Sequence, residues 1–170
     1  MARSDRHGMR TLWAALAVAA LTPLILTACS NNSSSSSSGT PQADETIFVQ
    51  KFRYHGMPTS IPSGVHEFEF QNRESFTITH EMIPIALPPG KTAQDVISGA
   101  KTNGPDDEDN WLHIGGDFGP ADTGASVVEW LYLPPGNYAI ACWQTGLPNN
   151  PSKEGPPHAA KGMVFQFKVT

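Results

Sequence analysis

Cysteine, histidine and methionine side chains bind transition metals, and four of those in this sequence are candidates for one site. Cys142 ends a short apolar run, and the only other cysteine is Cys29. His80 lies earlier in the chain, and His158 and Met163 follow Cys142. One thiolate, two imidazoles and one thioether together make the ligand set of a mononuclear copper centre. The residue types therefore predict a site for one copper ion at His80, Cys142, His158 and Met163.

Alternation of apolar and polar residues predicts the side of the sheet on which three of these side chains lie. In the run 76–82 one parity is apolar and includes His80, while the other is polar. Cys142 shares its parity with Tyr138 and Ile140, and Met163 begins the last apolar alternation. We therefore expect all three side chains to point into the core at the ends of their strands.

Each candidate ligand also has an ordinary interpretation. A lone buried cysteine such as Cys142 is most often a small core residue, and Met163 can be simple packing. His80 can be a core histidine bonded to the backbone, and His158 an exposed loop residue. Taken singly, each ordinary interpretation is favoured. Their joint occurrence in this order, with three side chains facing inward, favours the copper site.

Two segments carry a family resemblance. The segment 135–142 is similar to the Pro-Gly-x-Tyr-x-x-x-Cys strand of the cupredoxins, and the segment 158–163 resembles their His-x-x-x-x-Met closing segment. His80 matches the first histidine ligand of that family. The resemblance covers roughly residues 46–170. It implies an all-β, Greek-key β-sandwich with one type 1 copper, the copper being held by the four residues named above.

The sequence departs from the plastocyanin-like pattern in two places. Fifteen residues, 143–157, separate the cysteine from the second histidine, where plastocyanin-like proteins have only a few. Several prolines lie in this segment and lower the entropy cost of holding His158 in place. Glu81 stands where an asparagine is frequent, so hydrogen bonding around the ligands is expected to differ.

Turns and alternating runs divide the rest of the chain into short elements. Pro-x-Gly turns recur at residues 62–64, 88–90 and 134–136. A short helix is expected over 92–97 with Thr92 as N-cap, and a bulge near Pro84. The acid-rich residues 103–124 are expected to form a solvated loop rather than a calcium site. Strands are expected at about 46–54, 65–70, 76–82, 126–133, 137–143 and 163–169. These elements predict an all-β sandwich with one short helix.

The N-terminus has the features of a bacterial lipoprotein signal. Three arginines precede an apolar run, Leu12–Leu26, which is too short for a comfortable membrane span. Ala28 then precedes Cys29. We therefore expect a signal peptide at 1–28, lipidation of Cys29, a Ser-rich tether over 29–42 and a cupredoxin-like domain over 43–170. Such a protein is anchored to the cell membrane by lipid, on its extracytoplasmic face.

Charge and missing motifs exclude several classes of function. Removal of residues 1–28 takes away three Arg and one Asp, which leaves 8 basic and 15 acidic residues and a formal charge of −7. An acidic chain of this kind is not expected to bind nucleic acid or anionic lipid by charge. The sequence has no His-x-His pair, Gly-x-Ser-x-Gly motif or phosphate loop, so we expect no enzyme activity. His55, His66 and His113 are expected to lie outside the site.

Three functions remain open at this level. The first is one-electron transfer through a type 1 copper, between this lipid-anchored protein and a redox protein of unknown identity. The second is copper binding or delivery to an exchange partner through the same residues. The third is a metal-free, cupredoxin-like module for protein interactions, in which Cys142 is merely buried.

Overall fold

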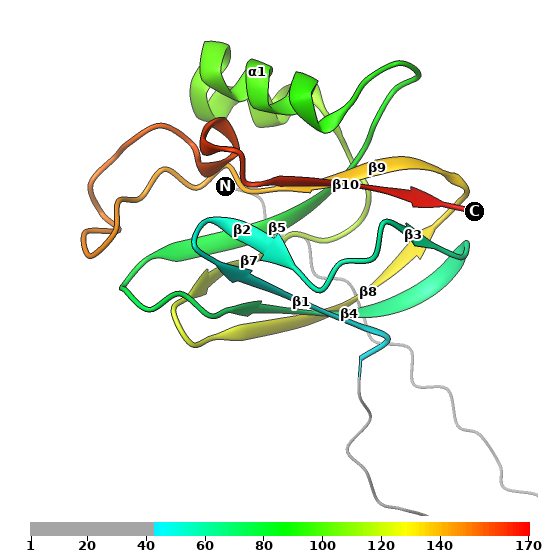
Figure 1. Cartoon of the computed structure of the whole chain (residues 1–170), viewed down its shortest axis with the longest axis horizontal. Coiled ribbons are helices and arrows are strands. Elements are labelled where there is room, and N and C mark those ends of the chain that lie inside the picture. Colours follow the sequence, from blue (N-terminus) through cyan, green and yellow to red (C-terminus); the bar gives the residue numbers. More distant parts are fainter. Residues whose placement is uncertain (1–42) are drawn as a thin grey trace, which may run out of the picture. The chain divides into compact units, whose positions relative to one another are not determined.

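The computed structural model describes residues 43–170, which contain ten strands, one α-helix and two short 3₁₀ turns (Figure 1). The predicted signal peptide, Cys29 and the tether lie outside the described residues. Within 43–170 no helix is long and apolar enough to span a membrane. The elements are β1 Glu45–Gln50, β2 Arg53–His55, β3 Ser60–Ile61, β4 Gly64–Asn72, β5 Thr79–Ala86, α1 Ala93–Asn103, η1 Gly104–Asn110, β6 Leu112–His113, β7 Phe118–Asp122, β8 Ser126–Leu133, β9 Gly136–Ala141, η2 His158–Lys161 and β10 Val164–Val169.

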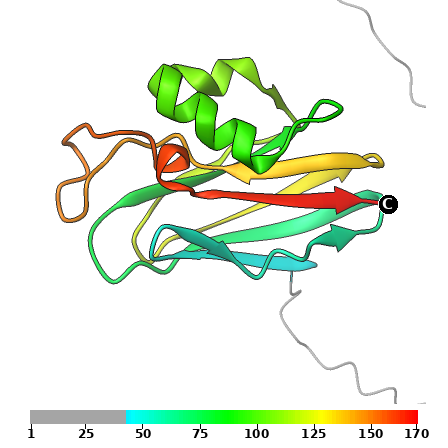
Figure 2. The same ribbon diagram turned by 45° about the horizontal axis from the view of Figure 1, so that its top comes forward.

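The strands form two sheets that face each other (Figure 2). One sheet has the order β2-β1-β4-β8, and the other has the order β3-β10-β9-β5-β6, with β7 paired to the first part of β5. β1 and β4 are parallel, and the long β4–β8 and β9–β10 pairs are antiparallel. The predicted β-sandwich is therefore confirmed.

The main core lies between the two sheets. Alternate residues of β4 and β8 are buried there, and Phe70 and Leu133 have no exposed surface. From the opposite sheet, alternate residues of β9 and β10 meet them, among them Cys142 just after β9 and Phe167 on β10. Period-two alternation therefore places Cys142 on the core side, as expected from the sequence.

A second core lies on the other face of the larger sheet, beneath α1. Val96 and Ala100 of the helix pack there with Ile83 and Ile85 of β5. The N-cap prediction is confirmed, because Thr92 precedes the helix and the Asp95 carboxylate accepts its N–H and its hydroxyl. The helix is longer than the predicted 92–97, because its apolar residues find a sheet face to cover.

The predicted strand over 46–54 is wrong, since these residues form a β-hairpin. β1 ends at Gln50, and β2 begins at Arg53 after a two-residue turn. Lys51 and Phe52 both have positive φ, 53° and 56°. A two-residue hairpin loop of type I′ needs positive φ at both central positions. Because neither residue is glycine or asparagine, this turn has no local sequence signature.

One further expectation, the bulge near Pro84, is corrected close to the site. The register of β5 shifts between His80 and Met82, and not near Pro84. The change of apolar parity beyond Met82 arises because β5 is covered on both faces, so Ile83 and Ile85 point toward α1.

Residues 103–124 are not a simple solvated loop, because they contain η1, β6 and β7. Asp107 is 2% exposed, and its carboxylate accepts hydrogen bonds from the side chains of Asn103, Asn110 and Trp111. This carboxylate fastens η1 to the end of α1. The acidic run is therefore partly structural, and both carboxylate oxygens of Asp107 are already bonded to the protein.

Candidate metal centre

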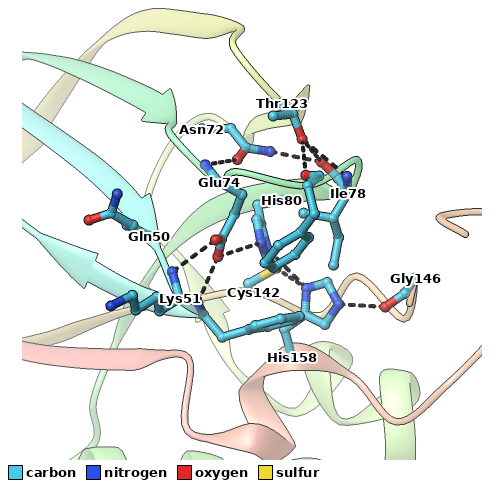
Figure 3. Close-up of polar contacts among 12 residues, drawn as sticks. Gln50, Lys51, Asn72, Glu74, Ile78, His80, Thr123, Cys142, Gly146 and His158 are labelled. Atoms are coloured by element: carbon cyan, nitrogen blue, oxygen red, sulfur yellow. Dashed lines mark hydrogen bonds and ion pairs between the residues drawn. The ribbon is translucent and has the colours of Figure 1, made fainter. Parts of the chain in front are cut away.

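Three of the four predicted ligands converge at one end of the sandwich (Figure 3). One donor atom from each of His80, Cys142 and His158 lies within 4.8 Å of the other two. Cys142 Sγ is 3.7 Å from His80 Nδ1 and 3.4 Å from His158 Nδ1, and the two Nδ1 atoms are 3.0 Å apart. All three side chains have 0% exposure.

Different elements deliver the three side chains. His80 lies on β5, and Cys142 follows the last residue of β9. His158 begins the 3₁₀ turn η2, which leads into β10. Because β9 pairs with both β5 and β10, the sheet itself fixes Cys142 beside the other two ligands.

The long segment 143–157 closes on itself, so its length does not separate the ligands. His158 N–H donates to Gln144 O at 2.9 Å, and Ala159 N–H donates to Cys142 O at 2.7 Å. These backbone bonds place the two ends of the segment side by side. The segment is also bonded to the approach of β5, since Asn149 N–H donates to Thr77 O at 2.8 Å.

Both Nδ1 atoms lie beside the thiol, and a hydrogen bond at Nε2 explains this orientation for His158. His158 Nε2 lies 2.9 Å from Gly146 O, so this nitrogen carries the proton and Nδ1 keeps its lone pair. His80 Nε2 has no hydrogen-bond partner within the described residues, and the nearest carboxylate oxygen, Glu74 Oε1, is 3.6 Å away. That separation is too long for a hydrogen bond.

The spacing of the donors fits one first-row metal ion. Bonds of about 2.0 to 2.3 Å to imidazole and thiolate, arranged in a trigonal plane, separate the donor atoms by roughly 3.5 Å. The observed separations of 3.0, 3.4 and 3.7 Å bracket this value. Two imidazoles and one thiolate in a trigonal set are typical of a type 1 copper site. The residues present therefore fit one type 1 copper.

Burial keeps the three ligands uncharged in the metal-free protein. It lowers the pKa of His80 to about 3, with a further decrease from the neighbouring His158. It lowers the pKa of His158 to about 4, although the Gly146 carbonyl opposes this shift. Burial also raises the pKa of the Cys142 thiol, as does the charge of Glu81. A metal must therefore displace the thiol proton, while neither neutral imidazole has to give up a net proton in order to bind.

Met163 lies next to the three convergent ligands. It has 0% exposure and packs in the same core cluster as Cys142. Its N–H donates to His158 O at 3.1 Å, and its carbonyl accepts the N–H of Cys142 at 3.3 Å. Gly162, with φ 94°, turns the backbone so that Met163 follows η2 directly. Its role as the fourth ligand remains a prediction.

Glu81 supports the site from the neighbouring face of β5, and it is 4% exposed. Its carboxylate accepts the N–H of Trp143 at 2.7 Å and the side-chain amide of Gln144 at 2.5 Å. Burial raises its pKa to about 6, against the effect of these two hydrogen bonds. Glu81 therefore joins β5 to the residues that follow Cys142.

Two residues near the site were not singled out from the sequence. The Phe52 ring lies edge-on to both imidazoles, with centroids 5.2 Å from His80 and 4.9 Å from His158. Glu74 is 5% exposed, and its carboxylate accepts the N–H groups of Lys51 and Phe52 at 2.9 and 2.7 Å. The contacts of both residues depend on the turn between β1 and β2, which was not predicted from the sequence.

The remaining histidines of the described residues lie elsewhere, as predicted. His55 Nε2 contacts Gln50 O, and His66 Nε2 contacts Pro62 O. His113 Nε2 is 3.8 Å from a carboxylate oxygen of Glu108. None of the three joins the metal-binding group.

The chain is similar to solved structures of blue-copper proteins. Dithionite-reduced auracyanin from Roseiflexus castenholzii is 21% identical, with a TM-score of 0.51 over 74% of this chain and 94% of that chain. The azurin Az-iso2 from Methylomonas sp. strain J is 13% identical, with a TM-score of 0.47 over 74% and 95%. No protein-family model and no curated protein sequence matches the chain. The likeness to auracyanin shows a cupredoxin fold, which confirms the fold implied by the sequence resemblance.

Proposed function

We propose that this protein is a one-electron carrier that holds a single type 1 copper with His80, Cys142 and His158, and with Met163 as the weak fourth ligand. The observation that carries the proposal is the convergence of three buried donor atoms within 4.8 Å. When bound, copper supplies a Cu(II)/Cu(I) couple that takes up and releases one electron. The protein contributes ligands whose positions are already set before the metal binds.

Burial favours electron transfer over copper delivery. A delivery protein has to expose its ligands so that a receiver can replace them one by one. Here all three side chains have 0% exposure, and backbone hydrogen bonds fasten the segment 143–157 over them. Close packing of this kind holds the ligands in one arrangement. Because none of the three side chains is exposed, a substrate cannot touch them, which supports a carrier rather than an enzyme.

The proposal includes the setting predicted from the sequence. Lipidation at Cys29 would hold the domain at the extracytoplasmic face of the cell membrane, on a tether of residues 29–42. The partner would be a redox protein within reach of that membrane. The acidic charge of the chain supports a protein partner rather than nucleic acid.

The deciding experiment is copper loading of the whole chain, followed by metal analysis and a visible spectrum. We expect one copper per chain and an intense blue absorption, which arises from the bond between copper and thiolate. Cys142→Ser should lose the colour. His66→Gln, a histidine outside the site, is the matched control and should keep it. A colourless wild-type protein after loading would refute the proposal in favour of a metal-free interaction module.

A second measurement separates electron transfer from delivery. We expect the loaded protein to exchange electrons rapidly with a soluble oxidant and to lose copper slowly to a chelator. Rapid loss of copper to a chelator, together with slow electron exchange, would identify a delivery protein instead.

A further inference from the structure

Neither ligand imidazole reaches the protein surface. His80 and His158 both have 0% exposure, so a redox partner cannot touch the edge of either ring. Phe52 is only partly buried, and its ring contacts both imidazoles at centroid distances of 5.2 and 4.9 Å. The Phe52 side chain therefore touches solvent as well as both ligand imidazoles, so this one residue connects the ligands to the surface.

Phe52 adopts a backbone conformation that phenylalanine disfavours, with a φ of 56°. Both central residues of the β1–β2 turn adopt left-handed φ values, which side chains other than glycine rarely adopt. Such strain persists only where surrounding contacts enforce it, and it is frequent at functional sites. Here the buried Glu74 carboxylate accepts both N–H groups of the turn. Figure 3 shows Glu74 between Lys51 and His80.

Aromatic and basic side chains surround Phe52. Phe76 stacks on it with a centroid distance of 6.0 Å, and Lys161 Nζ lies 4.9 Å from its centroid. Lys161 also lines a pocket of about 310 Å³ between α1 and η2. Lys101 lines the same pocket, beside Pro157, which directly precedes the ligand His158. The apolar contact at Phe52 therefore adjoins a pocket with two lysines.

The charged side chains that line this pocket are opposite in sign to the net charge of the chain. Residues 29–170 have a formal charge of −7, yet both charged residues of the pocket are lysines. Between residues 43 and 170 neither Lys101 nor Lys161 forms an ion pair. Two cations beside an apolar contact attract a partner whose own contact is apolar with an acidic rim.

From this geometry we propose that Phe52 and Phe76, with Lys161 and Lys101, form the docking surface for an acidic redox protein, and that Phe52 carries the contact to the metal ligands. The proposal rests on the electron-carrier function proposed above and names the surface and the partner class for that function. In the transfer step one electron leaves the reduced site and enters the acceptor, and no bond is made or broken.

Small probes of opposite charge test this surface on the whole 170-residue chain, kept in a neutral detergent. Hexacyanoferrate(III), an anion, accepts one electron from the reduced protein and becomes hexacyanoferrate(II). At low ionic strength Lys161→Gln and Lys101→Gln should each lower its rate about threefold, by loss of one nearby attraction. A cationic cobalt(III) phenanthroline oxidant should show an equal or higher rate.

Lys168→Gln is the matched control, because Lys168 is exposed on β10 and pairs with Ser60 and Asn137. It removes the same charge at the end of β10 remote from η2. An equal fall in the hexacyanoferrate rate for all three variants would show that only net charge matters, and this outcome would overturn the proposal. Equal effects on the anionic and cationic oxidants, or no effect on either, would also overturn it.

A second readout does not depend on copper. Hexacyanochromate(III), a paramagnetic anion, added to the metal-free chain should broaden the NMR signals of Phe52 and Lys161 more than those around Lys168. Broadening spread evenly over the surface would refute the docking surface. A colourless wild-type protein would refute the electron-carrier function alone, because this NMR measurement would still decide whether an anionic partner binds here.

Discussion

At the scale of single residues, the ligands make the metal-free protein sensitive to acid. Burial lowers the pKa of His80 to about 3 and of His158 to about 4, whereas both are near 6.5 in the unfolded chain. Below pH 6.5 the unfolded chain therefore binds protons that the folded protein does not, and stability falls. Glu81 opposes this between 4.5 and about 6, because its raised pKa makes the folded state bind the extra proton. The two histidine shifts outweigh it.

We therefore expect the melting temperature of the metal-free protein to fall as the pH is lowered from 7 to 4. The double variant His80→Gln/His158→Gln should show a much flatter profile, because it removes both groups. Calorimetry at several pH values checks this expectation. A wild-type melting temperature that stays constant or rises toward pH 4 would contradict it.

Glu74 gives a second prediction at this scale. Its two carboxylate oxygens each accept one backbone N–H of the left-handed turn. Glu74→Gln retains one acceptor oxygen and leaves one N–H unpaired, which should lower the free energy of unfolding by about 1–3 kcal/mol. Glu67→Gln, on the partly exposed side of β4, is the control and should change it by less than about 0.5 kcal/mol. Denaturant unfolding measures both.

The sequence was informative about ligands that lie on regular strands. Parity placed His80 and Cys142 on the core side, and the structure brings them together with His158. Phe52 and Glu74 escaped notice because their roles depend on long-range contacts. A phenylalanine in an alternating run has no local signal that its ring will cover two histidines from a distant strand and turn.

At the scale of elements, the segment 143–157 acts as a cover that is fastened at several points. Asn149 is one of these points, because its N–H donates to Thr77 O and its Oδ1 accepts the N–H of Thr77. Its φ of 59° is one that asparagine tolerates well. Spacing alone indicated a long loop, and it could not show that backbone pairing closes that loop beside Cys142.

We expect Asn149→Gly to keep the backbone conformation while it removes the side-chain bond to Thr77. The cover should then open more often, and a chelator should remove copper several-fold faster. Ser152→Ala, which changes an exposed residue of the same segment, should leave the rate unchanged. Equal rates for the wild type and Asn149→Gly would show that this bond does not hold the cover.

At the scale of the whole molecule, α1 completes a third layer over the larger sheet. The sequence indicated the helix and its cap, but its apolar residues could not reveal which sheet face they would cover. Val96 has 0% exposure at this interface. Val96→Ala should lower the free energy of unfolding by about 2 kcal/mol through the cavity it leaves.

Val65→Ala is the matched control for this layer, because Val65 is 60% exposed on β4. It should change the free energy of unfolding by less than about 0.5 kcal/mol. Equal losses for the two variants in denaturant unfolding would show that the contact of α1 with the sheet contributes little to stability.

The direction of β1 has a practical consequence. The described domain begins beside Glu45, and β1 runs from there to the turn that holds Phe52 against the ligands. Six residues of extended strand span about 20 Å. If the protein were attached to an electrode near Glu45, Phe52 would therefore lie on the side that faces away from the electrode. Dissolved partners could then reach it.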